Sequence, residues 1–193
     1  MKRMTRAVTT LAFAGLVAIS GFDTHAQSNA PKEEFDAIAI VSNNLGSGAG
    51  TVQMRVNRWS AEIERERLTN ALVQKGPEAL LKELIRTKPV GIIKTPDSLG
   101  YDLHYAYQRP GEDGGREIVI ATDRPIGFWE ARNQPRSFDY PFTVIQMQID
   151  RNGEGTGTLS YATRIRVVKD TIELENFATS PVMLTKISAR RST

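Results

Sequence analysis

The chain has 193 residues, with 25 Lys and Arg against 22 Asp and Glu, and it has no cysteine. The lack of cysteine excludes a thiolate nucleophile, zinc bound by cysteine and iron–sulfur clusters. Charges this close to balance give no reason to expect nucleic acid as a partner, because nucleic-acid binders present a clustered excess of Lys and Arg.

The first 26 residues have the pattern of an export signal. Lys2, Arg3 and Arg6 precede an apolar run over 7–20, and Ala26 ends a sequence suited to cleavage. The apolar run is shorter than the ~20 residues that span a bilayer, so we predict no membrane span. We predict a signal peptide over 1–26, a disordered leader over 27–34 and a single β-rich domain over 35–193, released into the periplasm or secreted.

Alternating apolar and polar residues predict nine strands in this domain, each with one buried and one wet face. The segments are 36–42, 52–57, 90–95, 101–108, 116–122, 144–149, 158–167, 171–177 and 182–187. Glycine-rich turns at 111–115 and 152–155 suit tight hairpins, which indicates that neighbouring strands are mostly antiparallel.

The segment 60–87 breaks this pattern and predicts two helices. Ser60 is expected to cap the first helix, and Gly76 followed by Pro77 ends it and starts the second. Leucines at helical spacing give each helix an apolar stripe, and Pro89 stops the second helix. The predicted fold class is therefore α+β: a mainly antiparallel, twisted β-sheet, as a sandwich or half-open barrel, with an inserted helical hairpin.

His104 is the only histidine after the export signal, so acid–base chemistry by histidine depends on it. Strand alternation places Asp102 on the same face, where a carboxylate can orient an imidazole as a general base. Ser98 is a weaker catalytic candidate, since its segment Thr-Pro-Asp-Ser-Leu-Gly does not match the G-x-S-x-G motif of a nucleophile elbow. The alternative for His104 is a partly exposed strand residue, and for Ser98 a turn.

No metal or cofactor site is predicted. The loop beginning at Asp150 has the first ligand spacings of a calcium loop, but Tyr161 stands at its twelfth position, where a bidentate Glu is required. A simple hairpin turn explains this segment equally well.

The loop over 123–141 is long and irregular, and it concentrates aromatic and arginine side chains. Its candidate binding residues are Phe128, Trp129, Arg132, Arg136 and Tyr140. Aromatic faces beside Arg suit a ligand or partner surface, whereas the same aromatics can also plug one end of the core. Both interpretations stay open at this point.

Four segments of the chain resemble a group of uncharacterised exported bacterial proteins with no assigned activity. They are the stretch beginning Thr-Val-Gln-Met-Arg-Val-Asn-Arg-Trp-Ser near Gly50, the loop over 123–141, Ile-Glu-Leu-Glu-Asn-Phe at 172–177 and Pro-Val-Met-Leu-Thr at 181–185. The resemblance covers most of the chain after the export signal and implies export but no reaction.

We therefore expect an exported, soluble, non-enzymatic module that binds an extracytoplasmic ligand or protein through the loop over 123–141. The alternative from another class is an extracellular or periplasmic hydrolase that uses His104 with Asp102, and with Asp97, Ser98 or Asp123 as further candidates, which requires a concave site around the imidazole. A third possibility is a structural envelope protein, which defined self-association would reveal.

Overall fold

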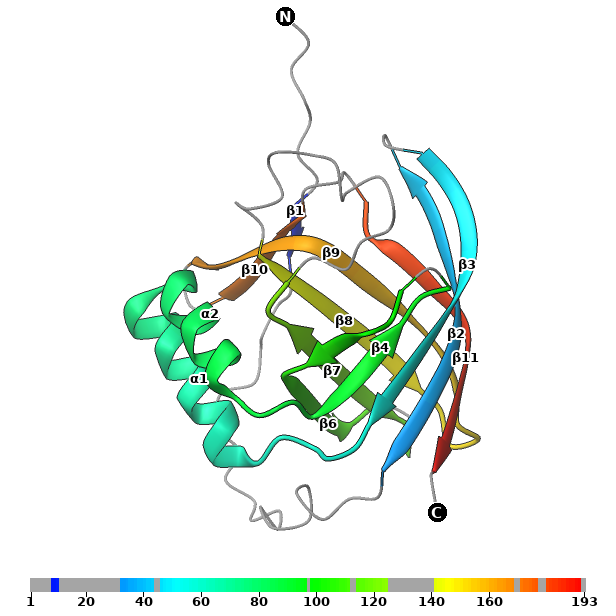
Figure 1. The fold of residues 1–193 in the computed structure, drawn as a ribbon, viewed down its shortest axis with the longest axis horizontal. Coiled ribbons are helices and arrows are strands. Elements are labelled where there is room, and N and C mark those ends of the chain that lie inside the picture. The colour runs from blue at the N-terminus through cyan, green and yellow to red at the C-terminus, as the bar shows by residue number, and fades with distance from the viewer. Residues whose placement is uncertain are drawn as a thin grey trace, which may run out of the picture.

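The computed structural model describes residues 8–10, 32–43, 46–96, 98–111, 114–124, 141–168, 171–176 and 180–191. These residues form a strongly curled antiparallel sheet, a half-barrel, with a helical hairpin on one outer side (Figure 1). The predicted fold class, including the helical hairpin, is confirmed.

The strands follow the predicted segments and mostly extend them. After β1 (Val8–Thr10), the order along the chain is β2 (Glu33–Asn43), β3 (Gly46–Val56), α1 (Glu62–Lys75), α2 (Pro77–Arg86), β4 (Gly91–Lys94), β5 (Tyr101–Leu103), β6 (Tyr105–Pro110), β7 (Arg116–Thr122), β8 (Phe142–Ile149), β9 (Glu154–Val168), β10 (Thr171–Asn176) and β11 (Val182–Arg191). β2 begins two residues inside the segment predicted as a leader, and β1 lies inside the predicted signal peptide.

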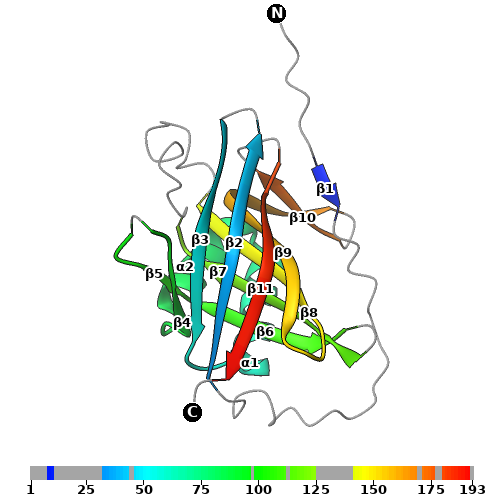
Figure 2. The ribbon, with the colours of Figure 1, turned by 90° about the vertical axis from the view of Figure 1, so that its right-hand side faces the viewer.

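The strand order in space is β5-β4-β3-β2-β11-β9-β8-β7-β6, with β10 and β1 added beside β9. The first long strand and the last, β2 and β11, are neighbours in the middle of the sheet (Figure 2). The two ends of the order, β5 and β6, are separated in sequence only by His104. At His104 the pairing partner of the chain changes from β4 to β7. Strands turn the corner of a sheet by a bend of this kind.

The curl is completed by short contacts near this corner. The backbone N–H of Val90 donates to the carbonyl of Leu103, and the N–H of His104 donates to the carbonyl of Ala121. On the middle strand, β11 carries a bulge between Thr185 and Ser188, where Lys186 has a φ of 49°. Such a bulge bends its strand and increases the local twist, which suits a sheet that curls this far.

The inner face of the sheet holds one hydrophobic core and the helical hairpin covers a second. Phe35, Met54 and Ile145 are among the buried residues of the inner core. The second core joins leucines of both helices to the outer face of β8, β9 and β10 through Leu68, Leu72, Leu80, Leu84, Phe142, Val144, Ile165 and Leu174. The prediction of one wet face is therefore wrong for β8, whose first four residues are all buried because a core lies on each side.

The first helix begins one residue later than Ser60 would place it. Ala61 is its N-cap, and the Glu64 carboxylate accepts the Ala61 backbone N–H at 2.9 Å. Ser60 is fully buried, exchanges hydrogen bonds with the Ala106 backbone and so attaches the start of the hairpin to β6. The predicted cap role of Ser60 is wrong because its hydroxyl is taken by this strand.

Candidate functional site

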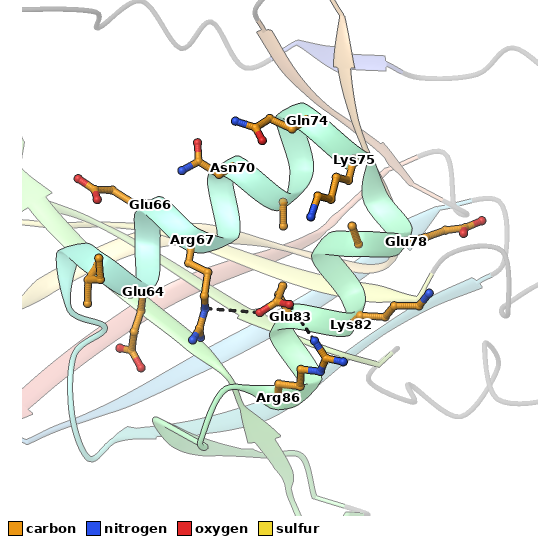
Figure 3. A pocket seen from close by; sticks show the side chains of 13 residues that line it. Glu64, Glu66, Arg67, Asn70, Gln74, Lys75, Glu78, Lys82, Glu83 and Arg86 are labelled. Atoms are coloured by element: carbon orange, nitrogen blue, oxygen red, sulfur yellow. Dashed lines mark hydrogen bonds and ion pairs between the residues drawn. The ribbon is translucent and has the colours of Figure 1, made fainter.

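The outer face of the helical hairpin is hollowed into a groove of about 790 Å³ between α1 and α2 (Figure 3). The buried leucines of both helices point the other way, into the second core, so most of the groove lining is charged or polar, with Ile63 and two alanines beside it. Ala71 and Ala79 line it with one methyl group each, one from each helix. Gly76 and Pro77 join the helices by a tight turn, so the helices lie side by side. The small side chains of Ala71 and Ala79 leave the groove open between them.

Charges of both signs line the groove, and those at one end are paired. Glu83 lies 3.6 Å from Arg67 on the other helix and 3.1 Å from Arg86, so one carboxylate bridges the hairpin (Figure 3). Lys75 and Lys82 form no ion pair with any residue in the described part of the chain. The groove therefore has an end whose charges are paired within the hairpin and an end where cationic groups can meet a partner.

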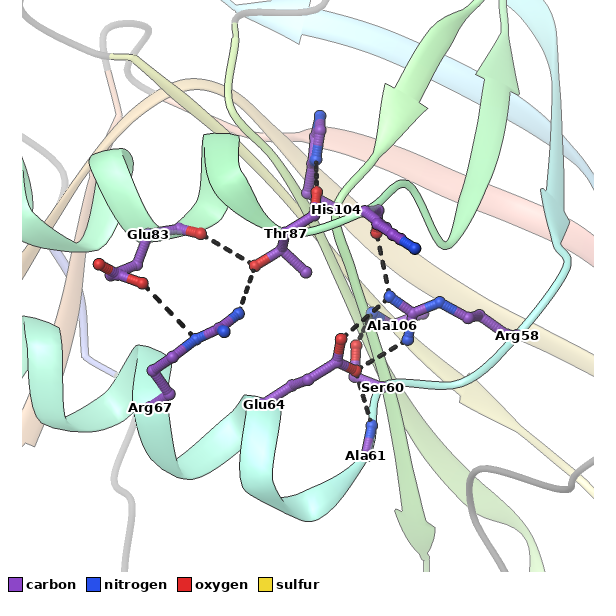
Figure 4. A network of polar contacts seen from close by, with 10 residues as sticks. Arg58, Ser60, Ala61, Glu64, Arg67, Glu83, Thr87, His104 and Ala106 are labelled. Carbon is purple, nitrogen blue, oxygen red and sulfur yellow. Dashed lines mark hydrogen bonds and ion pairs between the residues drawn. The ribbon is translucent and has the colours of Figure 1, made fainter.

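A polar network leads from the groove to the corner of the sheet (Figure 4). Arg67 donates to the Thr87 hydroxyl at 2.9 Å, and that hydroxyl donates to the carbonyl of Glu83. The Thr87 carbonyl in turn lies 2.8 Å from Nδ1 of His104. Since a carbonyl only accepts, Nδ1 of His104 carries a hydrogen and donates it to the end of α2.

The other ring nitrogen of His104 faces a carboxylate. Nε2 lies 3.5 Å from Oδ1 of Asp123, and both side chains are about nine-tenths buried. Burial by itself would raise the pKa of Asp123, but the hydrogen bond and charge of Arg124, with the His104 charge and the Thr122 hydroxyl, hold that pKa below its usual value. Both nitrogens of His104 are thus engaged, which makes the ring a link between α2 and the end of β7.

The catalytic candidates do not converge. His104 is buried, while Asp102, two residues earlier, is exposed, because the bend at His104 resets the strand alternation. The predicted common face of Asp102 and His104 is therefore not formed, and the carboxylate next to the imidazole is Asp123. The Ser98 hydroxyl accepts the N–H of Thr95 at 2.9 Å, as in a turn.

The aromatic and arginine residues predicted as a binding surface, Phe128, Trp129, Arg132, Arg136 and Tyr140, lie outside the described residues. Their neighbours Asp123 and Arg124 are described, and the Arg124 carbonyl accepts the Thr143 hydroxyl at 3.0 Å. The predicted binding surface in this loop therefore stays a prediction.

A second hollow of about 810 Å³ lies at the rim where the β6–β7 and β8–β9 turns meet the bulge of β11. Two of its charged side chains already have partners within the fold. Arg116 binds the buried carboxylate of Glu33 through two hydrogen bonds, and Asp150 accepts the N–H groups of Asn152 and Glu154. Lys186 is the lysine of this hollow, whereas the groove on the hairpin has two lysines without an ion pair among the described residues, Lys75 and Lys82, and is the better candidate for a contact surface.

Sequence reasoning missed the groove, although it predicted both helices that form it. The sequence does contain a sign of the groove, because Ala71 and Ala79 stand among charged residues of both signs. Whether these alanines leave a groove depends on how the two helices face each other, which the local sequence does not show. The Arg116–Glu33 pair was also missed, since 83 positions separate the two residues in the sequence.

Among the described residues, no cluster of His, Asp and Glu could hold a metal ion, and no helix is long and apolar enough to cross a membrane. Comparison of the chain with models of protein families, with curated proteins and with solved structures finds no match.

Proposed function

We propose that the protein is an exported, non-enzymatic binding module whose described contact surface is the groove between α1 and α2. The observation that carries this proposal is a concave surface with unpaired charges, on a hairpin whose other side is fixed to the sheet. A groove of about 790 Å³ falls within the usual range of binding sites, and a rigid support lowers the entropy lost on binding.

The chemistry of the groove favours a polypeptide segment that carries an acidic residue. Lys75 and Lys82 supply cationic groups at the end where the helices are joined, and Glu66 and Glu78 prevent a uniformly basic surface. A uniform polyanion would meet these carboxylates, whereas a short peptide can place one acidic side chain by the lysines. The exposed side chain of Ile63 adds an apolar contact at the opposite end of α1.

The proposal is tested with peptides selected from a displayed random library on the wild-type protein. We expect the selected peptides to bind an Ala79→Trp variant at least tenfold more weakly, because the indole fills the groove. We expect a Lys82→Glu variant to prefer peptides without acidic residues. Thr69→Trp, on an exposed position of α1 outside the groove, is the matched control and should bind as wild type does.

The same peptides distinguish the groove from the aromatic loop. If Trp129→Ala abolishes binding and Ala79→Trp leaves it unchanged, then the loop over 123–141 is the contact surface and the groove is not. Selected peptides that bind the Ala79→Trp, Lys82→Glu and Trp129→Ala variants as tightly as wild type would contradict both surfaces.

A further inference from the structure

The outer edge of β10 is occupied by a short strand from the start of the chain. β1 pairs antiparallel with β10, with Val8 opposite Glu175, Thr9 opposite Leu174 and Thr10 opposite Glu173 (Figure 2). Unpaired edge strands present a row of backbone N–H and C=O groups that accept another strand. The β10 edge is therefore shaped to accept an extended segment, and β1 shows how such a segment lies on it.

β10 is held in place by contacts that do not involve β1. It pairs with β9 along all six of its residues, and Leu174 is buried in the second core under the helices. The Thr163 hydroxyl of β9 also donates to the Asn176 side chain at 2.8 Å. The edge is thus expected to persist when β1 is withdrawn, which happens if the predicted signal peptide is cleaved near Ala26.

We propose that the β10 edge is a strand-acceptor site, filled by β1 in the full chain and, once β1 is removed, by an extended segment of another polypeptide. This site does not depend on the groove between the helices. Peptide addition to a sheet edge obtains affinity from backbone hydrogen bonds and selectivity from the alternate side chains.

The side chains of β10 define the occupant. Glu173 and Glu175 lie at the positions opposite Thr10 and Val8, so an acidic residue at either place would face a carboxylate. A second copy of β10 paired symmetrically about Leu174 would set Glu173 against Glu175, which disfavours self-pairing. The fitting partner is an uncharged, β-branched segment like Val8–Thr10.

A tethered strand outcompetes a separate one. β1 and β2 belong to one chain, with 22 residues between them, and joining two binding segments covalently raises their effective concentration to about the millimolar range. A peptide added at micromolar concentration therefore binds only where β1 has been disabled. This difference can be measured in the full chain.

The probe is a peptide of residues 5–12 with Thr10 replaced by Cys, offered under oxidising conditions to full chains that retain residues 1–26. The chain has no cysteine of its own, so a Glu173→Cys variant reports only this register. We expect disulfide trapping at least tenfold faster when Thr9→Pro also disables β1 than when β1 is intact. Thr51→Cys with Thr9→Pro, which places the thiol on an exposed site of β3, should trap only at the background rate.

A second peptide and a second variant complete the test. A peptide that also carries Val8→Glu should trap about threefold or more slowly, by repulsion from Glu175. A full chain with Thr10→Cys and Glu173→Cys should form its internal disulfide readily, whether or not the Thr9→Pro chains can be purified. The proposal is overturned if this internal disulfide fails to form, if trapping is equal at positions 51 and 173, or if the Thr9→Pro chain instead forms dimers.

Discussion

The buried ion pair between Glu33 and Arg116 connects the start of β2 to the start of β7, and its removal should be costly. Both terminal nitrogens of the Arg116 guanidinium donate to the carboxylate, at 2.7 and 2.8 Å, and one of them also donates to the side chain of Gln108. Arg116→Met leaves Glu33, which is only 3% exposed, as an uncompensated charge. Breaking a buried pair costs about 3–5 kcal/mol, and because Arg116 is 24% exposed we expect the lower end, about 3 kcal/mol.

The free energy of unfolding is measured by urea titration followed by circular dichroism. Arg109→Met is the matched control, since Arg109 on β6 pairs with Glu117 on β7 nearer the solvent, and the loss of this pair should cost less than about 1 kcal/mol. The double variant Glu33→Met with Arg116→Met should recover much of the loss, because two apolar groups need no partner. A loss below about 1 kcal/mol for Arg116→Met, or a double variant whose loss equals the sum of the single losses, would refute this reasoning.

Three further predictions follow from other contacts. His104→Leu should lower the free energy of unfolding by about 1–3 kcal/mol in urea titrations, because the Thr87 carbonyl loses its buried donor. The pKa of Asp123 is lowered in the fold, so its carboxylate stabilises the fold above its unfolded pKa of about 4. This stabilisation is lost as the pH falls through the pKa of the folded state. The melting temperature should therefore drop less on acidification in Asp123→Asn than in wild type. Gly155→Ala should cost more than about 1 kcal/mol, since its Cβ would lie 2.0 Å from the Gln148 carbonyl oxygen, and Gly48→Ala, which meets nothing within 4 Å, should show no comparable loss of melting temperature.

Local patterns predicted most of the elements. Gly76 and Pro77 fix the joint between the helices by their own backbone preferences, so the two helices could be placed to within a few residues. Period-two alternation likewise located the strands, because the strands from β2 to β9 and β11 each have a face against the inner core, and β10 places Leu174 in the second core. These signals are contained within a dozen neighbouring residues.

Features that depend on distant parts of the chain could not be predicted. The bend at His104 reverses the side on which the ring lies, and it arises because β5 and β6 pair with strands at opposite ends of the sheet order. Ser60 is a residue type typical of a helix N-cap, yet its hydroxyl accepts the backbone N–H of Ala106. Glu33 stands in a polar segment that resembles a leader, and only its ion pair with Arg116 shows that it belongs to the fold. In each case a tertiary contact overrides a sound local preference.

The place of β11 has a consequence for how the protein is made. Since this last strand lies between β2 and β9, the sheet without it has two parts, β5-β4-β3-β2 and β9-β8-β7-β6, which meet only at the corner around His104. A chain emerging from the ribosome cannot fill the gap between β2 and β9 until residues 182–191 have been synthesised. The sheet therefore stays open between β2 and β9 during almost all of the synthesis of the polypeptide.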